Sequence, residues 1–197
     1  MKVYDISQEV FSCKVYPGDL PPIKNTISSI ENGDVCNLTE FSMCAHNGTH
    51  VDAPYHFFSD GKTVDKMDLD SFVGYCYVAE HCGVIDENDI KNIVANARAE
   101  HPECANRILI KGNATLSAEA ATLLANDKVV LFGNESQTVG PEEAPMQVHK
   151  ILLGAGVALL EGIRLQDVNE GCYILCSAPL NLSGADGAPC RAVLIQI

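Results

Sequence analysis

The chain has 197 residues, of which 47% are hydrophobic and 20% are charged. This composition favours one globular domain over residues 1–197 and argues against disorder, because the apolar content can offset the conformational entropy lost on folding. The net charge of −13 repels phosphate backbones and anionic lipid, which makes nucleic acid and membranes poor candidate partners. No signal peptide and no apolar run of about 18 residues is visible, so we expect a cytoplasmic protein.

The first part of the chain is predicted to contain turns and strands. Residues 16–19, Tyr-Pro-Gly-Asp, form a turn, and Pro21-Pro22 breaks any helix before residue 23. Residues 37–46 alternate as a strand does, with His46 at the end of that strand. Residues 71–84 are rich in β-branched and aromatic side chains and predict a further strand.

Three helices are predicted in the remainder. Residues 87–98 have apolar side chains at helical spacing, and Asp86 is their N-cap. Residues 117–126 form a second helix that begins at its N-cap, Ser117. Residues 146–153 form the third helix, which ends at a Gly-Ala-Gly sequence. Further strands are predicted over residues 108–110, 128–133, 157–160, 173–178 and 192–197. These elements predict a strand-rich, mixed α/β or α+β domain.

The nine cysteines are scattered, and none forms a C-x-x-C pair. A reducing cytoplasm disfavours disulfides, so we expect most of these thiols to be small hydrophobic groups in the core. Cys172 and Cys176 lie four residues apart in a predicted strand and would share one face. A structural zinc site on these two cysteines is the alternative.

Side chains that can bind metals are concentrated in the segment HNGTHVDAPYH, residues 46–56. His50 and Asp52 are two residues apart and project to the same side of an extended chain. Gly48 gives the turn the freedom to bring His46 beside them. Imidazole and carboxylate are the usual ligands of zinc, manganese and iron(II), so the spacing predicts a divalent metal site.

The same segment resembles the cyclase family of metal-dependent hydrolases, which includes bacterial kynurenine formamidase and isatin hydrolase. The family motif H-x-G-T-H-x-D-A-P-x-H is matched by residues 46–56 without a gap. Two softer motifs, D-I-S and P-G-D, are matched at residues 5–7 and 17–19. Later matches are His149, Leu152-Leu153, Glu161 and Asn181-Leu182. The resemblance therefore covers nearly the whole chain.

The resemblance implies a swivelling β/β/α domain that assembles as a homodimer or larger homo-oligomer. It implies two divalent ions per subunit, most simply zinc, with manganese or iron(II) as alternatives. The implied ligands are His46, His50, Asp52, His149 and Glu161. Asp52 and Glu161 would be the shared carboxylates, and His56 would be the catalytic histidine beside them. Without the resemblance, His149 would be interpreted as a surface helix residue and Glu161 as a charge at a strand end.

The implied activity is arylformamidase-like hydrolysis of an amide-type C–N bond of a small molecule in tryptophan catabolism. Metal ions would activate water and polarise the substrate carbonyl, and His56 would act as general base and then as general acid. No G-x-S-x-G motif is present, which disfavours a serine nucleophile. Ring opening of a cyclic amide, isatin or lactone is one alternative, and a non-catalytic metal-binding homologue is the other.

One stretch departs from the family pattern. Family members carry G-I-D-x-x-S-V-D-P, whereas residues 133–141 place Glu135 at the first aspartate and Gly140 at the second. Tyr16 stands where kynurenine formamidases often carry tryptophan. These changes leave the expected ligands intact. They do not specify the substrate, and they retain the non-catalytic homologue as an alternative.

Overall fold

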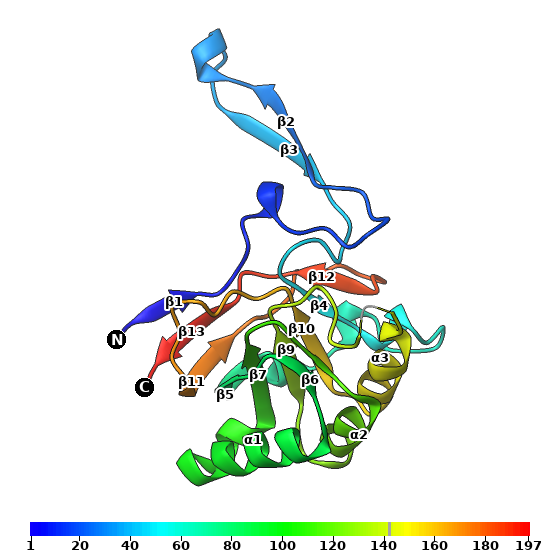
Figure 1. Ribbon diagram of the computed structural model, residues 1–197. Coiled ribbons are helices and arrows are strands. Elements are labelled where there is room, and N and C mark those ends of the chain that lie inside the picture. The colour runs from blue at the N-terminus through cyan, green and yellow to red at the C-terminus, as the bar shows by residue number, and fades with distance from the viewer. Residues whose placement is uncertain (142) are drawn as a thin grey trace.

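The computed structural model describes residues 1–141 and 143–197. Its main element is a curled sheet of nine strands (Figure 1). From one edge to the other, these are β1 (Val3–Asp5), β13 (Val193–Gln196), β11 (Gly171–Cys176), β5 (Val73–Glu80), β7 (Arg107–Lys111), β9 (Leu131–Asn134), β10 (Ala158–Glu161), β4 (His50–Asp52) and β12 (Gly187–Pro189). Strands β5, β7, β9 and β10 are parallel, and the remaining neighbours pair antiparallel. The expected strand-rich, mixed α/β fold is confirmed.

Three α-helices pack against one face of this sheet: α1 (Glu87–Glu100), α2 (Ala118–Asn126) and α3 (Pro145–Gly154). Both predicted N-caps are confirmed, because the Asp86 carboxylate accepts hydrogen bonds from two amides of the first turn of α1, and the Ser117 hydroxyl accepts one from Ala120. None of the helices among the described residues has the length and apolar character that crossing a bilayer requires.

The two faces of the sheet bury separate apolar clusters. On the helix side, Ile93, Leu124 and Leu152 from the three helices meet sheet residues such as Phe132. On the opposite face, Val51 and Leu160 are fully buried in a second cluster. Because side chains alternate along a strand, burying Val51 on one face directs both its neighbours in β4 to the other. That alternation directs His50 and Asp52 to the same face of the sheet.

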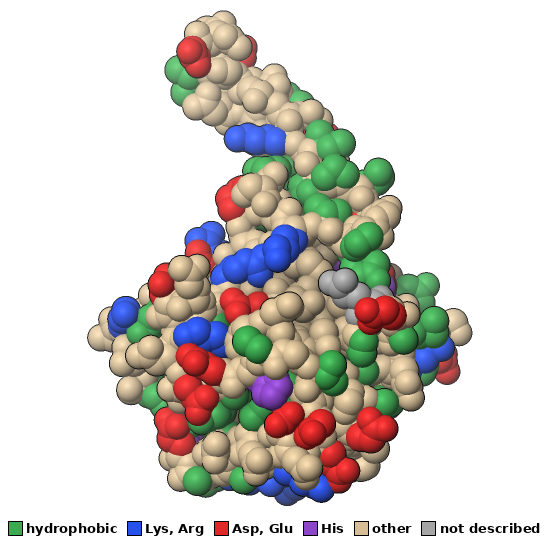
Figure 2. Space-filling model, viewed as in Figure 1, with side chains coloured by type: hydrophobic (Ala, Val, Ile, Leu, Met, Phe, Trp, Pro, Cys, Tyr) green, Lys and Arg blue, Asp and Glu red, His purple; other side chains and the backbone are tan. Residues whose placement is uncertain are grey.

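A two-stranded arm stands clear of the body (Figure 1). It consists of β2 (Ile23–Ser28) and β3 (Leu38–Ser42), which pair antiparallel. Apolar side chains lie exposed along the arm (Figure 2). A second small sheet pairs β6 (Gly83–Ile85) with β8 (Ala114–Leu116) in parallel. Short 3-10 turns occupy Val10–Ser12, Ile30–Asn32, Pro54–His56, Val64–Lys66, Leu69–Ser71 and Pro102–Asn106.

The predicted strands differ from the observed ones by one or two residues at their ends, and three of them differ by more. The strand expected over residues 37–46 ends at Ser42. A turn follows it, in which the amide of Cys44 donates a hydrogen bond to Oδ1 of Asn47. His46 therefore lies in a turn and does not end a strand. The strand expected over 71–84 is divided into β5 and β6, and the strand expected over 128–133 begins at Leu131.

The cysteine predictions were wrong in two respects. Cys104 and Cys172 form a disulfide with a Cα–Cα distance of 6.1 Å, which removes Cys172 from any zinc site shared with Cys176. Only Cys76, Cys104 and Cys172 are buried, so most of the thiols are not core residues.

Candidate metal centre

The site is built on β4, which lies between β10 and β12 in the sheet. In this register, Glu161 at the end of β10 is the Cα partner of His50, and Gly187 of β12 is the partner of Asp52. His46 comes from the turn before β4. Gly48 has φ +68°, in the left-handed region, which confirms the role expected for a glycine in this turn. His149 reaches the same point from α3.

Two groups of donor atoms meet at the Asp52 carboxylate. Oδ1 of Asp52 lies 2.8 Å from Nδ1 of His46 and 3.3 Å from Nε2 of His50. Oδ2 of Asp52 lies 3.5 Å from Nε2 of His149, which is itself 3.0 Å from Oε1 of Glu161. Within each group, His46–His50–Asp52 and Asp52–His149–Glu161, the donor atoms lie within 4.8 Å of one another. All five predicted ligands therefore converge.

The imidazole rings are oriented by acceptors on their outer sides. Nδ1 of His50 donates to the carbonyl of Gly48 at 3.0 Å, and Nδ1 of His149 donates to the carbonyl of Pro145 at 2.9 Å. A carbonyl oxygen only accepts, so in both neutral rings the lone pair is on Nε2. These lone pairs face carboxylate oxygens, which is favourable only with a proton or a metal cation between them. Outer acceptors of this kind are typical of metal-binding histidines.

Without a metal, protons stabilise this arrangement. Burial alone would lower the pKa of His50, but hydrogen bonds to Asp52 and Glu161 raise it to about 9. Burial opposes a similar rise for His149, whose bond to Glu161 raises its pKa to about 9. Burial likewise opposes the rise for His46, whose bonds to Asp186 and Asp52 bring its pKa to about 10. Burial would raise the pKa of Asp52, yet the histidines hold it well below its usual range.

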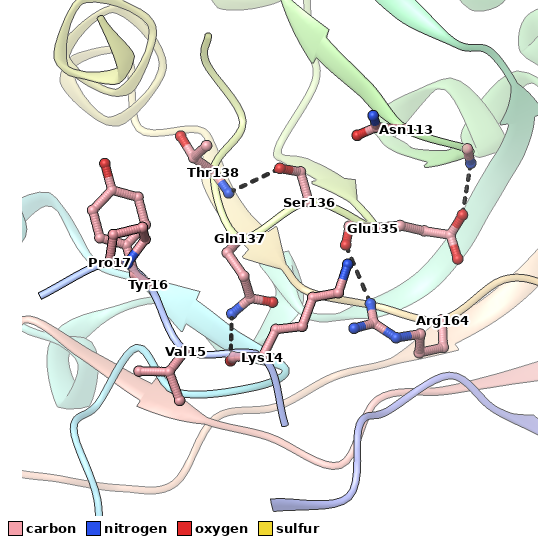
Figure 3. A pocket seen from close by; sticks show the side chains of 11 residues that line it. Lys14, Val15, Tyr16, Pro17, Asn113, Glu135, Ser136, Gln137, Thr138 and Arg164 are labelled. Carbon is pink, nitrogen blue, oxygen red and sulfur yellow. Dashed lines mark hydrogen bonds between the residues drawn. The ribbon is translucent and has the colours of Figure 1, made fainter. Parts of the chain in front are cut away.

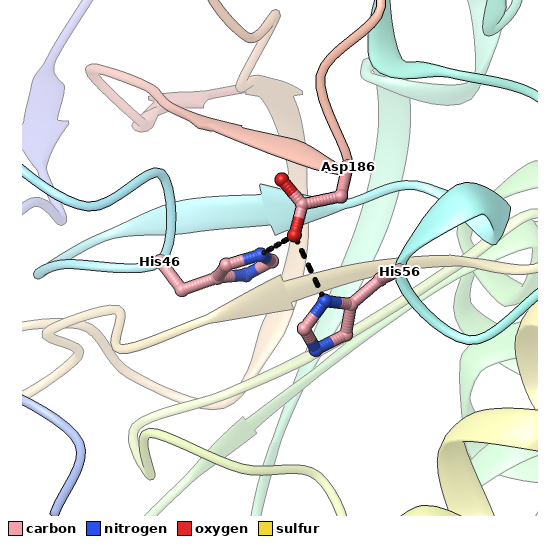
Figure 4. A group of neighbouring side chains, drawn as sticks. All are labelled: His46, His56 and Asp186. Atoms are coloured by element: carbon pink, nitrogen blue, oxygen red, sulfur yellow. Dashed lines mark hydrogen bonds and ion pairs between the residues drawn. The ribbon is translucent and has the colours of Figure 1, made fainter. Parts of the chain in front are cut away.

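One further residue of the site, Asp186, was not predicted from the sequence. Its Oδ2 accepts from Nε2 of His46 at 2.9 Å and from Nδ1 of His56 at 3.1 Å (Figure 4). The two imidazole rings lie with their centroids 4.1 Å apart. The bond to His46 is the main reason that the pKa of Asp186 is strongly lowered. Asp186 directly precedes β12 in an Asp-Gly sequence that is typical of a turn, so no periodicity marked it.

These side chains line a cavity of about 560 Å³, which we call the site cavity. His56 lies at its edge with 30% of its side chain exposed, whereas His50, Asp52 and Glu161 are buried. The other walls come from distant segments and include Tyr16, Cys44, Phe57, Gln137, Thr138 and Pro145. The arrangement offers buried ligands below and a partly exposed histidine at the opening, with room for a small molecule between them.

Comparison with known proteins identifies the family. The model of the Cyclase family matches residues 4–141. The chain belongs to the Cyclase family. A kynurenine formamidase of Erythrobacter litoralis is 32% identical to this cyclase-family chain over 210 residues, covering 100% of the chain and 94% of the relative. The expected membership is confirmed.

Two solved structures share the fold of this cyclase-family chain. One, described as a potential metal-dependent hydrolase with cyclase activity, is 28% identical with a TM-score of 0.83 and covers 98% of this chain and 96% of its own. The other, isatin hydrolase A from Labrenzia aggregata, is 21% identical with a TM-score of 0.82 and covers 100% and 94%. The fold is that of metal-dependent hydrolases.

Residues 133–141, which depart from the family pattern, form hydrogen bonds that hold the site in place. The Glu135 carboxylate accepts the amides of Gly112 at 2.7 Å and Leu165 at 2.8 Å, and so fixes the loop. The amide of Val139 donates to Oε1 of Glu161 at 2.8 Å. The stretch thus holds one of the five converging side chains, which argues against its being degenerate.

Proposed function

We propose that this protein is a metal-dependent amidohydrolase that cleaves the C–N bond of an aryl formamide. The observation that carries the proposal is the convergence of three histidines and two carboxylates around Asp52, with the lone pairs of His50 and His149 directed at carboxylate oxygens. The donor set of imidazole and carboxylate fits zinc first, and manganese or iron(II) as alternatives. The two groups of donors that share Asp52 fit two ions per chain.

Five residues would bind the metal ions, and His56 would transfer the proton. His46, His50 and Asp52 would hold one ion, and Asp52, His149 and Glu161 the other. Divalent ions bound there supply Lewis-acid polarisation of a carbonyl and a lowered pKa for water. His56 directs one ring nitrogen to Asp186, which orients the ring and leaves Nε2 for proton exchange. His56 accepts the proton of the attacking water and returns it to the leaving nitrogen.

The substrate class is supported by the relatives. Curated proteins at 32% identity over nearly their whole length are kynurenine formamidases, which favours the formamide of kynurenine and a role in tryptophan catabolism. The shared fold with isatin hydrolase keeps ring opening of a cyclic amide or lactone as the second candidate. We further propose a cytoplasmic homo-oligomer of single-domain chains, most simply a homodimer, in keeping with the exposed apolar arm.

The test is a substrate panel assayed with protein loaded separately with zinc and with manganese. N-formylkynurenine, isatin and small cyclic imides would be compared by kcat/KM. We expect N-formylkynurenine to be the best substrate and a His50→Ala variant to lose metal and turnover together. A panel led by isatin would favour ring opening, and full activity in the His50→Ala variant would refute the metal assignment.

A further inference from the structure

A second and larger cavity adjoins the site cavity. It has a volume of about 1000 Å³ and is formed by residues 14–17, 112–113, 135–138 and 164 (Figure 3). We call it the lateral cavity. Tyr16, Gln137 and Thr138 line both cavities, so the two share a wall. The two cavities are therefore neighbours that meet at these three residues.

The two cavities differ in their lysine, arginine and acidic side chains. Asp19, Asp52, Glu161 and Asp186 line the site cavity, and among the described residues no lysine or arginine does so. The lateral cavity contains Lys14 and Arg164, in a chain with only 13 such residues and a net charge of −13. Its one acidic residue, Glu135, directs both carboxylate oxygens to backbone amides. Two cationic side chains and one acidic side chain line the lateral cavity, so its net charge favours an anion.

The Arg164 side chain and the Lys14 backbone are held by hydrogen bonds, and both side chains have unused donors. Nη1 of Arg164 donates to the carbonyl of Glu135 at 3.2 Å (Figure 3) and to the carbonyl of Ile163 at 2.7 Å, which holds the guanidinium in place. Its Nε and Nη2 have no hydrogen-bond acceptor within the described ranges 1–141 and 143–197. The carbonyl of Lys14 accepts from Nε2 of Gln137 at 3.2 Å. In the described part of the chain no carboxylate forms an ion pair with either cation, although the charge of Glu135 acts on Arg164.

We propose that the lateral cavity is a subsite for a carboxylate of the substrate, bound by Lys14 and Arg164. A planar carboxylate matches the fork of the guanidinium, and the ammonium of Lys14 adds a second charged donor. The proposal rests on the proposed function and specifies the substrate further. The substrate must be an elongated anionic amide. Its formamide lies at the metal centre, and its amino-acid arm lies in the lateral cavity. A neutral aryl formamide would lack this contact.

The test compares ligands with and without that arm. L-Kynurenine and 2-aminoacetophenone share an aryl ketone and an aniline, but only the first has the carboxylate. Binding of both to zinc-loaded protein would be measured by calorimetry. In Lys14→Met we expect L-kynurenine to bind about 10-fold more weakly and 2-aminoacetophenone to bind unchanged, because one charge-assisted bond is lost. Lys14→Arg should restore the affinity.

Kinetics provide a second readout on the same variants. The KM for N-formylkynurenine should rise about 10-fold in Lys14→Met with kcat unchanged, since the lost contact is equal in ground and transition states. Lys91→Met, which removes an exposed lysine of α1 that is paired with Glu87, is the matched control and should behave as wild type.

The outcomes separate this inference from the proposed function. Wild-type protein that binds L-kynurenine with the expected Lys14 dependence but hydrolyses no formamide would contradict the function alone. Turnover of N-formylkynurenine that is indifferent to Lys14, or equal weakening of both ligands in Lys14→Met, would overturn the subsite alone. Failure of the wild-type protein to bind L-kynurenine would also overturn the subsite.

Discussion

Nε2 of His149 lies 3.0 Å from Oε1 of Glu161, across the junction between helix α3 and strand β10. On one continuous helix, two residues twelve positions apart would not share a face. Here the helix ends at Gly154, the amide of Val157 bonds back to Leu152, and β10 returns to the sheet. The strand thereby places Glu161 beside His149 of the helix. The second group of donor atoms is completed by this reversal.

Asp186 is expected to position two histidines. Asp186→Asn keeps the shape but removes the charge that holds His46 and His56. Since outer partners of metal-binding histidines are worth about 10- to 100-fold in affinity, we expect zinc binding at least about 10-fold weaker and a lower kcat. Chelator competition would measure the affinity. Asp68→Asn, at an 81% exposed side chain, is the control. Unchanged zinc affinity in Asp186→Asn would contradict this role.

The stability of the metal-free protein should fall as the pH rises. Folding raises the pKa of His50 and His149 from 6.5 to about 9, and that of His46 to about 10. A group whose pKa is raised by folding stabilises the native state fully below pH 6.5, and that contribution is lost as the pH rises through the folded pKa. Urea denaturation in EDTA should therefore show a free energy of unfolding that decreases from pH 6.5 to 10. A flat or rising profile would show that the three histidines are not held by the carboxylates.

His56 should be needed for turnover and dispensable for metal binding. His56→Gln removes the group proposed to exchange the proton, and general acid–base catalysis of this kind contributes about 10²- to 10⁴-fold. We expect kcat to fall within that range while zinc content, measured by atomic absorption, stays at the wild-type level. Loss of zinc together with activity would instead make His56 a ligand.

Gly187 should not tolerate a side chain. A Cβ at this position would lie 2.7 Å from Cε1 of His46 and 2.6 Å from the carbonyl oxygen of Val51, so the ring or the strand must shift. Overpacking of this kind costs about 1–3 kcal/mol. For Gly187→Ala we expect a lower free energy of unfolding in urea and weaker zinc binding. Wild-type values for both would show that His46 does not pack against β12 as described.

The helices and the central motif could be predicted because their signals are local. The N-caps at Asp86 and Ser117 precede apolar residues at helical spacing, and residues 46–56 contain three converging side chains and His56 within eleven positions. His149 and Glu161 were placed by the family pattern and not by periodicity. Nothing in their own segments distinguishes a buried ligand from an exposed charge.

The remaining features depend on tertiary structure. Asp186 acquires its partners only because β12 pairs with β4, a register that no local pattern specifies. The Cys104–Cys172 disulfide joins residues separated by 68 positions. The strand before His46 was predicted too long, since alternation continued through residues that Asn47 folds into a turn. In each case a contact between distant segments, or a side chain bonded to the backbone, decided the local structure.

The central claim is that five side chains hold two divalent ions around Asp52. Anomalous diffraction at the zinc edge, from crystals grown with zinc, tests it most directly. We predict two peaks on either side of the Asp52 carboxylate, one between His46 and His50 and one between His149 and Glu161. The claim would be contradicted by a map without peaks at Asp52, or with a single peak between His56 and Asp186.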